Sequence, residues 1–127
     1  MDITPLVKSG QQIIKSYAGG VFKVNNNSYP HAIIVTPDKT ELWDIGDISE
    51  VSELTMAHFS LLIEKLNDLD VVLFGCGKNM VFLPPQLKSE LKKSGLNMDI
   101  MDSGAACRTY NVLMAEGRRV AAILLPA

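Results

Sequence analysis

The fold of this 127-residue chain is decided by residues 99–125, which read DIMDSGAACRTYNVLMAEGRRVAAILL. Residues 99–101 are predicted to form a strand, and the helical spacing of apolar residues that follows predicts a helix over 103–116. Gly117 is expected to end that helix, because glycine adopts the left-handed conformation of a helix C-terminus. The apolar run at 120–125 then has the length of a buried strand. The stretch therefore predicts a strand–helix–strand unit.

The predicted helix carries an apolar stripe and a polar stripe. The apolar stripe, at i, i+4 and i+7, consists of Ala106, Tyr110 and Leu113 and is expected to pack in the core. The polar stripe holds Arg108 and Asn111 and lies close to Ser103, the predicted N-cap. Two interpretations stay open. Either these residues face a crevice that holds an anionic or polar group, or Arg108 pairs with Asp102 or Glu116 and Asn111 satisfies a loop carbonyl.

Upstream of this unit, helical segments again alternate with short apolar runs. One helix is predicted to begin after Thr55, and another to lie between Pro85 and Gly95. Between the two, the run VVLF at residues 71–74 is too short for a helix and predicts a buried strand that ends in Gly75-Cys76-Gly77.

The first third of the chain predicts an antiparallel meander. Its three β-rich runs are residues 12–17, 21–24 and 31–35, separated by the turn-forming stretches Gly19-Gly20 and Asn25-Asn26-Asn27. The whole pattern predicts an α/β fold, with helices on both faces of a sheet and a β-meander before it.

Composition limits the class of protein. Hydrophobic residues make up 47% and charged residues 20%, which is typical of one globular domain, here residues 1–127. A net charge of -2 without lysine- and arginine-rich runs argues against a nucleic-acid binder. The N-terminus has no targeting pattern, and no apolar run is long enough to span a membrane. With only Cys76 and Cys107 and no CxxC motif, we interpret the sequence as a bacterial cytoplasmic protein.

The Gly75-Cys76-Gly77 turn has two interpretations. At the carboxyl end of a strand in an open α/β sheet, glycines allow a ligand to approach the backbone closely. A dinucleotide site would need a further glycine where Met80 stands, so the alternative is a tight turn after a buried strand. Neither Cys76 nor Cys107 has a histidine nearby in sequence, and both are expected to behave as small hydrophobes.

No pattern in the sequence predicts a metal, a cofactor or a catalytic residue. His31 and His58 do not have the spacing of zinc ligands. A nucleophile elbow, a P-loop and an HExxH motif do not occur.

An acidic residue stands at every third position around the only tryptophan. The acids are Asp38, Glu41, Asp44, Asp47, Glu50 and Glu53. One interpretation is a surface for a basic protein partner, with Trp43 as anchor beside Asp44 and Asp47. The other is a solvated loop with a core tryptophan.

The block MDSGAACRTYNVLMAEGRRVAAILLP, with LFGCGK before it and PPQL and SGL elsewhere, resembles the Mth938-domain family, which includes a mitochondrial assembly factor of respiratory complex I. The positions that match its signature are Met101, Ser103, Ala105, Ala106, Arg108, Thr109, Tyr110, Asn111, Leu113, Glu116, Arg118 and Val120. The resemblance runs from about Gln12 to Pro126. It implies a three-layer fold with a central mixed sheet, a smaller β-layer formed by the N-terminal meander, and about three helices.

The resemblance also implies a function. It indicates a non-enzymatic protein-binding module without a cofactor, an assembly factor for respiratory complex I, and leaves a homo-oligomer open. It further implies that Gly75, Arg108, Asn111 and Glu116 line one site, with Cys76, Gly77 and Ser103. The alternative is an anion-binding protein or enzyme whose crevice lies between the Gly75–Gly77 turn and the helix start at Ser103.

Overall fold

The computed structural model describes residues 10–48 and 50–126. Residues 1–9, on which the prediction about targeting rests, lie outside the described residues, as do Ser49 and Ala127. The strands are β1 (Ile14–Ser16), β2 (Phe22–Val24), β3 (Asn27–Tyr29), β4 (Ile33–Val35), β5 (Thr40–Leu42), β6 (Val71–Gly75), β7 (Met98–Met101) and β8 (Val120–Leu124). The helices are α1 (Ser60–Glu64), α2 (Pro85–Lys93) and α3 (Ser103–Ala115), with 3-10 turns η1 (Val51–Glu53), η2 (Met56–Phe59) and η3 (Leu66–Asp68).

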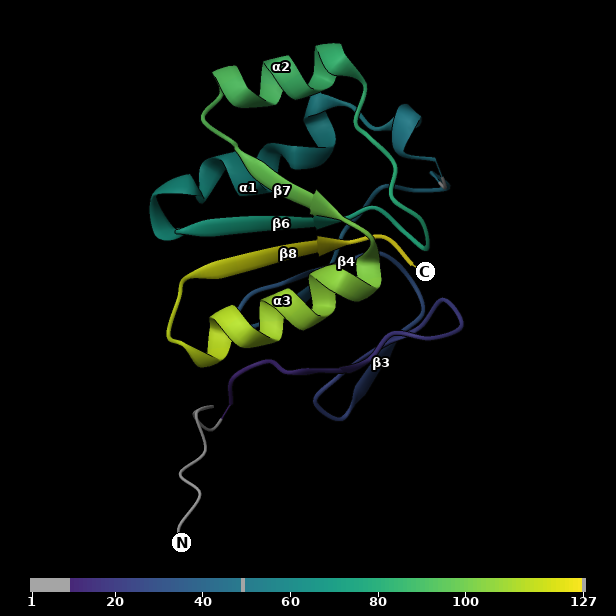
Figure 1. The fold of residues 1–127 in the computed structure, drawn as a ribbon, viewed down its shortest axis with the longest axis vertical. Coiled ribbons are helices and arrows are strands. Elements are labelled where there is room, and N and C mark those ends of the chain that lie inside the picture. The colour runs from purple at the N-terminus through teal and green to yellow at the C-terminus, as the bar shows by residue number, and fades with distance from the viewer. Residues whose placement is uncertain (1–9, 49, 127) are drawn as a thin grey trace, which may run out of the picture.

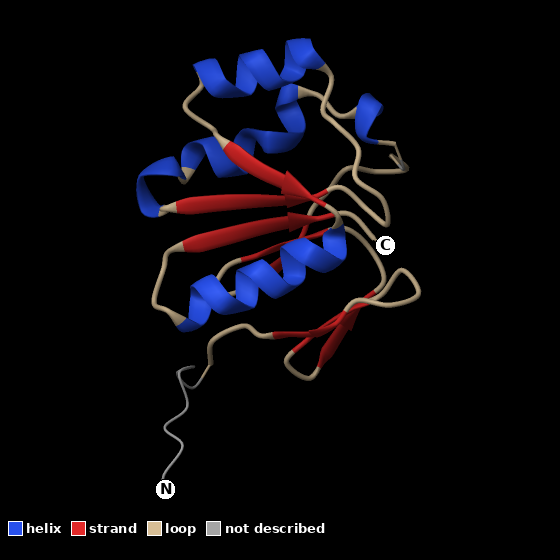
Figure 2. Cartoon of the chain, in the orientation of Figure 1, coloured by secondary structure: helices blue, strands red, loops and turns tan. Residues whose placement is uncertain are grey.

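A mixed five-stranded sheet forms the middle layer, which confirms the predicted fold class. Its strand order is β5-β4-β8-β6-β7. Strand β6 is parallel to both β7 and β8, whereas β4 is antiparallel to both β5 and β8. Strand β8, which comes last along the chain, therefore lies at the centre of the sheet (Figures 1 and 2).

The central sheet is buried on both faces. In β8, Val120, Ala122 and Leu124 pack with α3 and the small sheet, whereas Ala121 and Ile123 pack with the opposite core beneath α1 and α2. Because both alternating sets of side chains are buried, the strand is apolar without interruption. Three layers result, with α1 and α2 on one side and α3 with a small sheet on the other (Figure 1).

The meander differs from its predicted strands. The small sheet has the order β1-β2-β3, and its third strand is residues 27–29, not 31–35. A turn was predicted at Asn25-Asn26-Asn27, but only Asn25 and Asn26 form it. Asn25 has φ +52°, and Asn27 already pairs with Val24 as the first residue of β3. The apolar run at 31–35 instead supplies β4 of the central sheet, where all three strand residues are buried. The apolar run thus joins the central sheet, where both of its faces are buried, and does not pair with the strand nearest to it in sequence.

The ends of α2 follow their sequence signals. Pro85 is its first residue, and Gly95 adopts φ +90° after its last turn. The Leu96 amide then donates to the Leu91 carbonyl at 2.9 Å, which closes the helix end. The helix predicted after Thr55 is broken into η2, α1 and η3, so only residues 60–64 are α-helical.

Candidate functional site

A crevice was predicted between the Gly75–Gly77 turn and α3, but hydrogen bonds hold the turn directly against the start of the helix. Ser103 is fully buried; its hydroxyl accepts a hydrogen bond from the Gly77 amide at 2.9 Å and donates one to the Leu125 carbonyl. The Ser103 amide donates to the Gly77 carbonyl at 2.8 Å. These bonds fasten the end of β6, the start of α3 and the end of β8 to one another. The Ser103 hydroxyl is thus engaged within the protein.

The N-cap of α3 is one residue earlier than predicted. Asp102 has extended backbone angles, and its carboxylate accepts a hydrogen bond from the Ala105 amide at 2.9 Å. Ser103 is instead the first residue of the helix. Aspartate and serine cap helices about equally well, so the local sequence could not separate the two positions.

Gly75 allows the helix to approach the sheet closely. A Cβ atom at this position would lie 2.9 Å from both Cα and Oγ of Ser103 and 2.8 Å from Cδ2 of Leu124. Because Cα of Ser103 belongs to the backbone of α3, the helix would have to move to admit a side chain. The glycine is therefore required by packing.

The two cysteines lie in different cores. The Cys76 thiol donates to the Asn79 carbonyl at 3.3 Å and accepts from the Val81 amide at 3.2 Å, which organises the loop after β6. Cys107 is buried on the other face of the sheet, beneath α3. Burial raises the pKa of its thiol to about 12, although the positive charge of Arg108 acts in the opposite direction. Both cysteines are free.

Arg108 is exposed on α3 and lies against Tyr17. Its guanidinium donates a hydrogen bond to the Tyr17 hydroxyl and lies 5.9 Å from the ring centroid, a cation–π distance. Gly104 makes room for this contact, because a Cβ there would lie 2.9 Å from Cε2 of Tyr17. Tyr17 was not predicted from the sequence, because it precedes Arg108 by 91 positions and gives no local signal.

Asn111 fastens the small sheet to α3. Its side-chain oxygen accepts from the Ile14 amide at 3.0 Å, and its nitrogen donates to the Ile14 carbonyl at 2.8 Å. The hydroxyl of the preceding residue, Tyr110, donates to the Gln12 carbonyl at 2.8 Å. Asn111 thus satisfies backbone groups, which is the structural alternative considered for it.

Glu116 lies at the far end of α3 from Ser103. The helix has 13 residues and is about 20 Å long, so the structure does not bring Glu116 to the Gly75–Gly77 turn. Glu116 lines a separate groove of about 690 Å³, together with charged side chains that include Lys65, Arg118 and Arg119.

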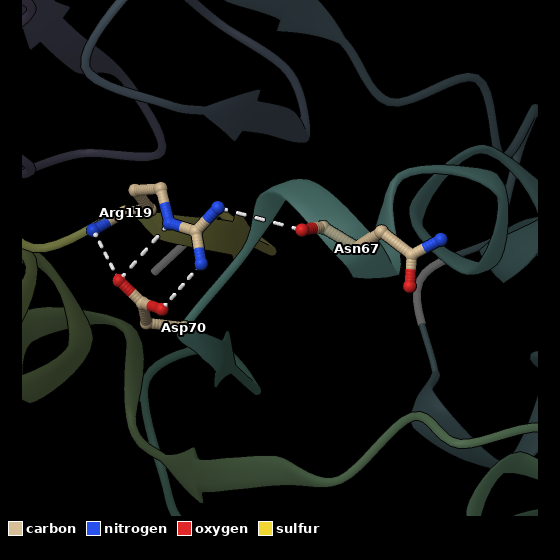
Figure 3. A network of polar contacts seen from close by, with 3 residues as sticks. All are labelled: Asn67, Asp70 and Arg119. Atoms are coloured by element: carbon tan, nitrogen blue, oxygen red, sulfur yellow. Dashed lines mark hydrogen bonds and ion pairs between the residues drawn. The ribbon is translucent and has the colours of Figure 1, made fainter.

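Arg119, which also lines this groove, forms an ion pair with Asp70 that was not predicted from the sequence. Figure 3 shows the pair. Nη2 of Arg119 lies 2.8 Å from Oδ1 of Asp70, and Nε lies 3.2 Å from Oδ2. Nη1 donates to the Asn67 carbonyl at 3.4 Å. The hydrogen bonds from Arg119 lower the pKa of Asp70 to about 2. The guanidinium is therefore already occupied by neighbours within the chain.

Trp43 is a core residue. Its side chain is 3% exposed, its ring packs against Phe59 and Phe74, and its indole donates to the His58 carbonyl at 2.7 Å. This burial gives no support to Trp43 as an exposed anchor. Of the predicted partner surface, Asp44 and Asp47 are exposed.

The solvent face of α3 carries Arg108, Val112 and Glu116, four residues apart, which we call the α3 stripe. Val112 is 60% exposed although it is a large apolar residue. Its exposure was missed, since a valine in an amphipathic helix is ordinarily assigned to the buried face. The stripe presents a cation, an apolar group and a carboxylate side by side.

Within residues 10–48 and 50–126, no group of three histidine, cysteine, aspartate or glutamate side chains is placed to hold a metal ion. The helices in those residues are all too short or too polar to cross a bilayer.

The chain is a three-layer α/β domain. The side chains of α3 hydrogen-bond to the small β-layer and so hold it against the central sheet. Residues 14–125 match the family described as "Protein of unknown function (DUF498/DUF598)". A Bordetella pertussis protein described as a Mth938-like domain has the same fold, with a TM-score of 0.75 and 28% sequence identity over 99% of this chain and 92% of that one. The chain therefore belongs to the Mth938-domain family, as its signature indicated.

Relatives with descriptive names include a eukaryotic and a bacterial protein. A zebrafish (Danio rerio) protein called NADH dehydrogenase [ubiquinone] 1 alpha subcomplex assembly factor 3 is 31% identical over 93% of this chain and 66% of its own length. A Francisella tularensis protein called 13 kDa major membrane protein is 29% identical over 87% of this chain and 88% of its own length. The chain thus spans slightly less than two thirds of the zebrafish relative.

Proposed function

We propose that this chain is a non-enzymatic protein-binding module that assists the assembly of respiratory complex I, acting in the bacterial cytoplasm. The observation that carries the proposal is the similarity to the zebrafish assembly factor across 93% of the chain. A match over 118 of the 127 residues has to include α3. The partner is then a subunit of complex I or another protein of its assembly.

We place the partner contact on the α3 stripe. Arg108 is held in position by Tyr17, so little side-chain freedom is lost when it binds. Val112 offers apolar area between two opposite charges, a combination typical of protein interfaces. Asp44 and Asp47 are a second candidate contact for a basic partner.

A second candidate function is the binding of a small anion at Arg108. One observation favours it: among the described residues, Arg108 forms no salt bridge, and its hydrogen bond to Tyr17 leaves other guanidinium N–H groups for a ligand. A thermal-shift series with phosphates, carboxylates and nucleotides tests this function. A ligand at one hundred times its Kd stabilises by about 2.7 kcal/mol, and Arg108→Ala should abolish that shift.

The assembly role is tested in the native host, provided that it contains complex I. The gene is deleted, and wild-type or variant protein is expressed in its place. We expect less assembled complex I on native gels and lower NADH:ubiquinone oxidoreductase activity in the deletion strain. Wild-type protein should restore both, and a tagged copy should capture complex I subunits.

The matched variants locate the surface. Arg108→Ala combined with Val112→Asp should fail to restore assembly, whereas Lys15→Ala combined with Lys23→Ala, at exposed positions of the small sheet, should restore it. Equal rescue by both pairs would remove the α3 stripe from the proposal. Normal complex I in the deletion strain would remove the assembly role itself.

A further inference from the structure

Three consecutive large hydrophobic residues are exposed: Met80, Val81 and Phe82, which we call the apolar tip. They lie in the connection from β6 to α2, which runs along the outside of the molecule before it enters α2 (Figure 1). Phe82 is 75% exposed. Single exposed apolar residues are ordinary in proteins, but a continuous exposed group marks a contact surface.

The loop that carries the apolar tip is anchored at both ends. At its start, the Cys76 sulfur binds the Asn79 carbonyl and the Val81 amide. At its end, Leu83 is 4% exposed in the core, and Pro85 begins α2. The exposed side chains are therefore presented by a loop with fixed attachments.

The same segment is strongly basic. Residues 76–96 carry four lysines and one glutamate, a net charge of +3; because the whole chain has -2, the remaining residues carry -5. The lysines are Lys78, Lys88, Lys92 and Lys93, and all are exposed. None of them takes part in a salt bridge within the described residues. Their charge is thus available to an external anion.

We propose that the apolar tip and these four lysines form a binding surface for an anionic lipid bilayer. The apolar side chains would enter the boundary between headgroups and acyl chains, while the lysines attract the lipid phosphates. A bilayer fits this composition better than a protein does, because lysine is depleted in protein interfaces and enriched at lipid-binding surfaces.

This surface is separate from the α3 stripe. Helix α2 packs in the core on one face of the central sheet, and α3 packs in the core on the other. A membrane and a protein partner can therefore be bound at the same time. Lipid binding is also independent of which protein the α3 stripe recognises.

Sedimentation of the full chain with vesicles tests the proposal. We expect binding to vesicles of phosphatidylcholine mixed with phosphatidylglycerol, none to phosphatidylcholine alone, and weaker binding as salt is raised. Replacing Lys88, Lys92 and Lys93 with glutamine should weaken binding by about fivefold per lysine. Phe82→Ser should weaken it as well.

Matched control variants keep the surface intact. Val112→Ser removes an exposed apolar group from α3, and Lys15→Gln combined with Lys23→Gln removes exposed lysines from the small sheet. Both should bind vesicles like the wild-type protein. Equal losses in these controls, or no binding to phosphatidylglycerol vesicles, would overturn the proposal.

Fluorescence distinguishes insertion from simple adhesion. In Phe82→Trp, the new indole should shift its emission to shorter wavelength with phosphatidylglycerol vesicles, over a constant background from buried Trp43. Val112→Trp should show no shift. Sedimentation without the shift at position 82 would contradict insertion of the apolar tip. If the tip variants lose complex I subunits but no vesicle binding, the surface docks a protein and the lipid proposal is wrong.

Discussion

The side-chain amide of Asn111 hydrogen-bonds both backbone groups of Ile14, across 97 positions of sequence. The amide thereby takes the place of a neighbouring strand along the edge of β1. Ile14 also pairs with Val24 of β2, so the bonds connect α3 to the small sheet as a unit. The attachment of one layer to the rest of the molecule thus depends on a helix side chain.

Asn111→Ala should destabilise the protein by about 1–3 kcal/mol, because the Ile14 amide and carbonyl lose their partners while partly buried. Urea unfolding measures the loss. Hydrogen exchange should also become faster in β1 and β2 than in the central sheet. Val112→Ala, at the next position of α3 and 60% exposed, is the control and should stay within about 0.5 kcal/mol of wild type. Equal effects of the two changes would contradict the role of Asn111.

Gly75→Ala should cost about 1–3 kcal/mol, because the added methyl group meets Cα of Ser103 and forces α3 away from the sheet. Gly104→Ala is the matched comparison: its methyl group meets side chains alone, the ring of Tyr17 at 2.9 Å and polar atoms of Arg108 and Asp102 at 3.3 Å, and these can move aside. Thermal or urea unfolding of both variants should show the smaller loss for Gly104→Ala. The reverse order would show that the helix–sheet joint tolerates expansion.

The Asp70–Arg119 pair should contribute stability in a defined pH range. Because the folded-state pKa of Asp70 is about 2, below its ordinary value of 3.8, the folded protein binds fewer protons between these values than the unfolded chain does. The stabilisation is therefore complete above about pH 4 and is lost as pH falls through 2. Asp70→Asn should differ from wild type in melting experiments at neutral pH and converge with it near pH 2.

Two observations check the assignment of this pH dependence. An NMR titration of the Asp70 carboxyl group should give a midpoint near 2. Since the pair is exposed, added salt should reduce the difference between Asp70→Asn and wild type. A midpoint at the ordinary aspartate value would show that the ion pair does not persist in solution.

Cys107 should resist alkylation in the folded protein, because its thiol is buried and burial raises its pKa to about 12. Mass spectrometry after treatment with iodoacetamide at pH 8 should find Cys107 unmodified until denaturant is added. Phe82→Cys introduces a thiol at an exposed position and provides the control for reagent activity. Rapid labelling of Cys107 under native conditions would contradict the burial of this part of α3.

Much of the fold could be predicted because its signals are local or periodic. The run at 71–74, the Pro85 and Gly95 signals of α2 and the limits of α3 each follow from neighbouring residues. The sheet membership of residues 31–35 could not be read in this way, because the apolar pattern does not specify which strand will be the neighbour. The third strand of the small sheet was missed because asparagines are typical of turns.

The candidate site was less predictable than the fold, because its contacts join distant parts of the sequence. Arg108, Asn111 and Ser103 were selected by residue type, but their partners Tyr17, Ile14 and Leu125 leave no trace in the neighbouring sequence. Trp43 illustrates the same limit. Its acidic surroundings suggested a surface, whereas contacts with two distant phenylalanines place it in the core.

The central position of β8 has a consequence for synthesis on the ribosome. Strands β4 and β6 are made earlier, yet each pairs with β8 along a full edge. Until residues 120–124 leave the exit tunnel, both edges lack their partner and both adjoining apolar faces lack part of their cover. The nascent chain therefore cannot complete this sheet during translation of its first seven strands. In that interval the unpaired strand edges and uncovered apolar faces are most prone to aggregate, and a chaperone that covers them would have its largest effect.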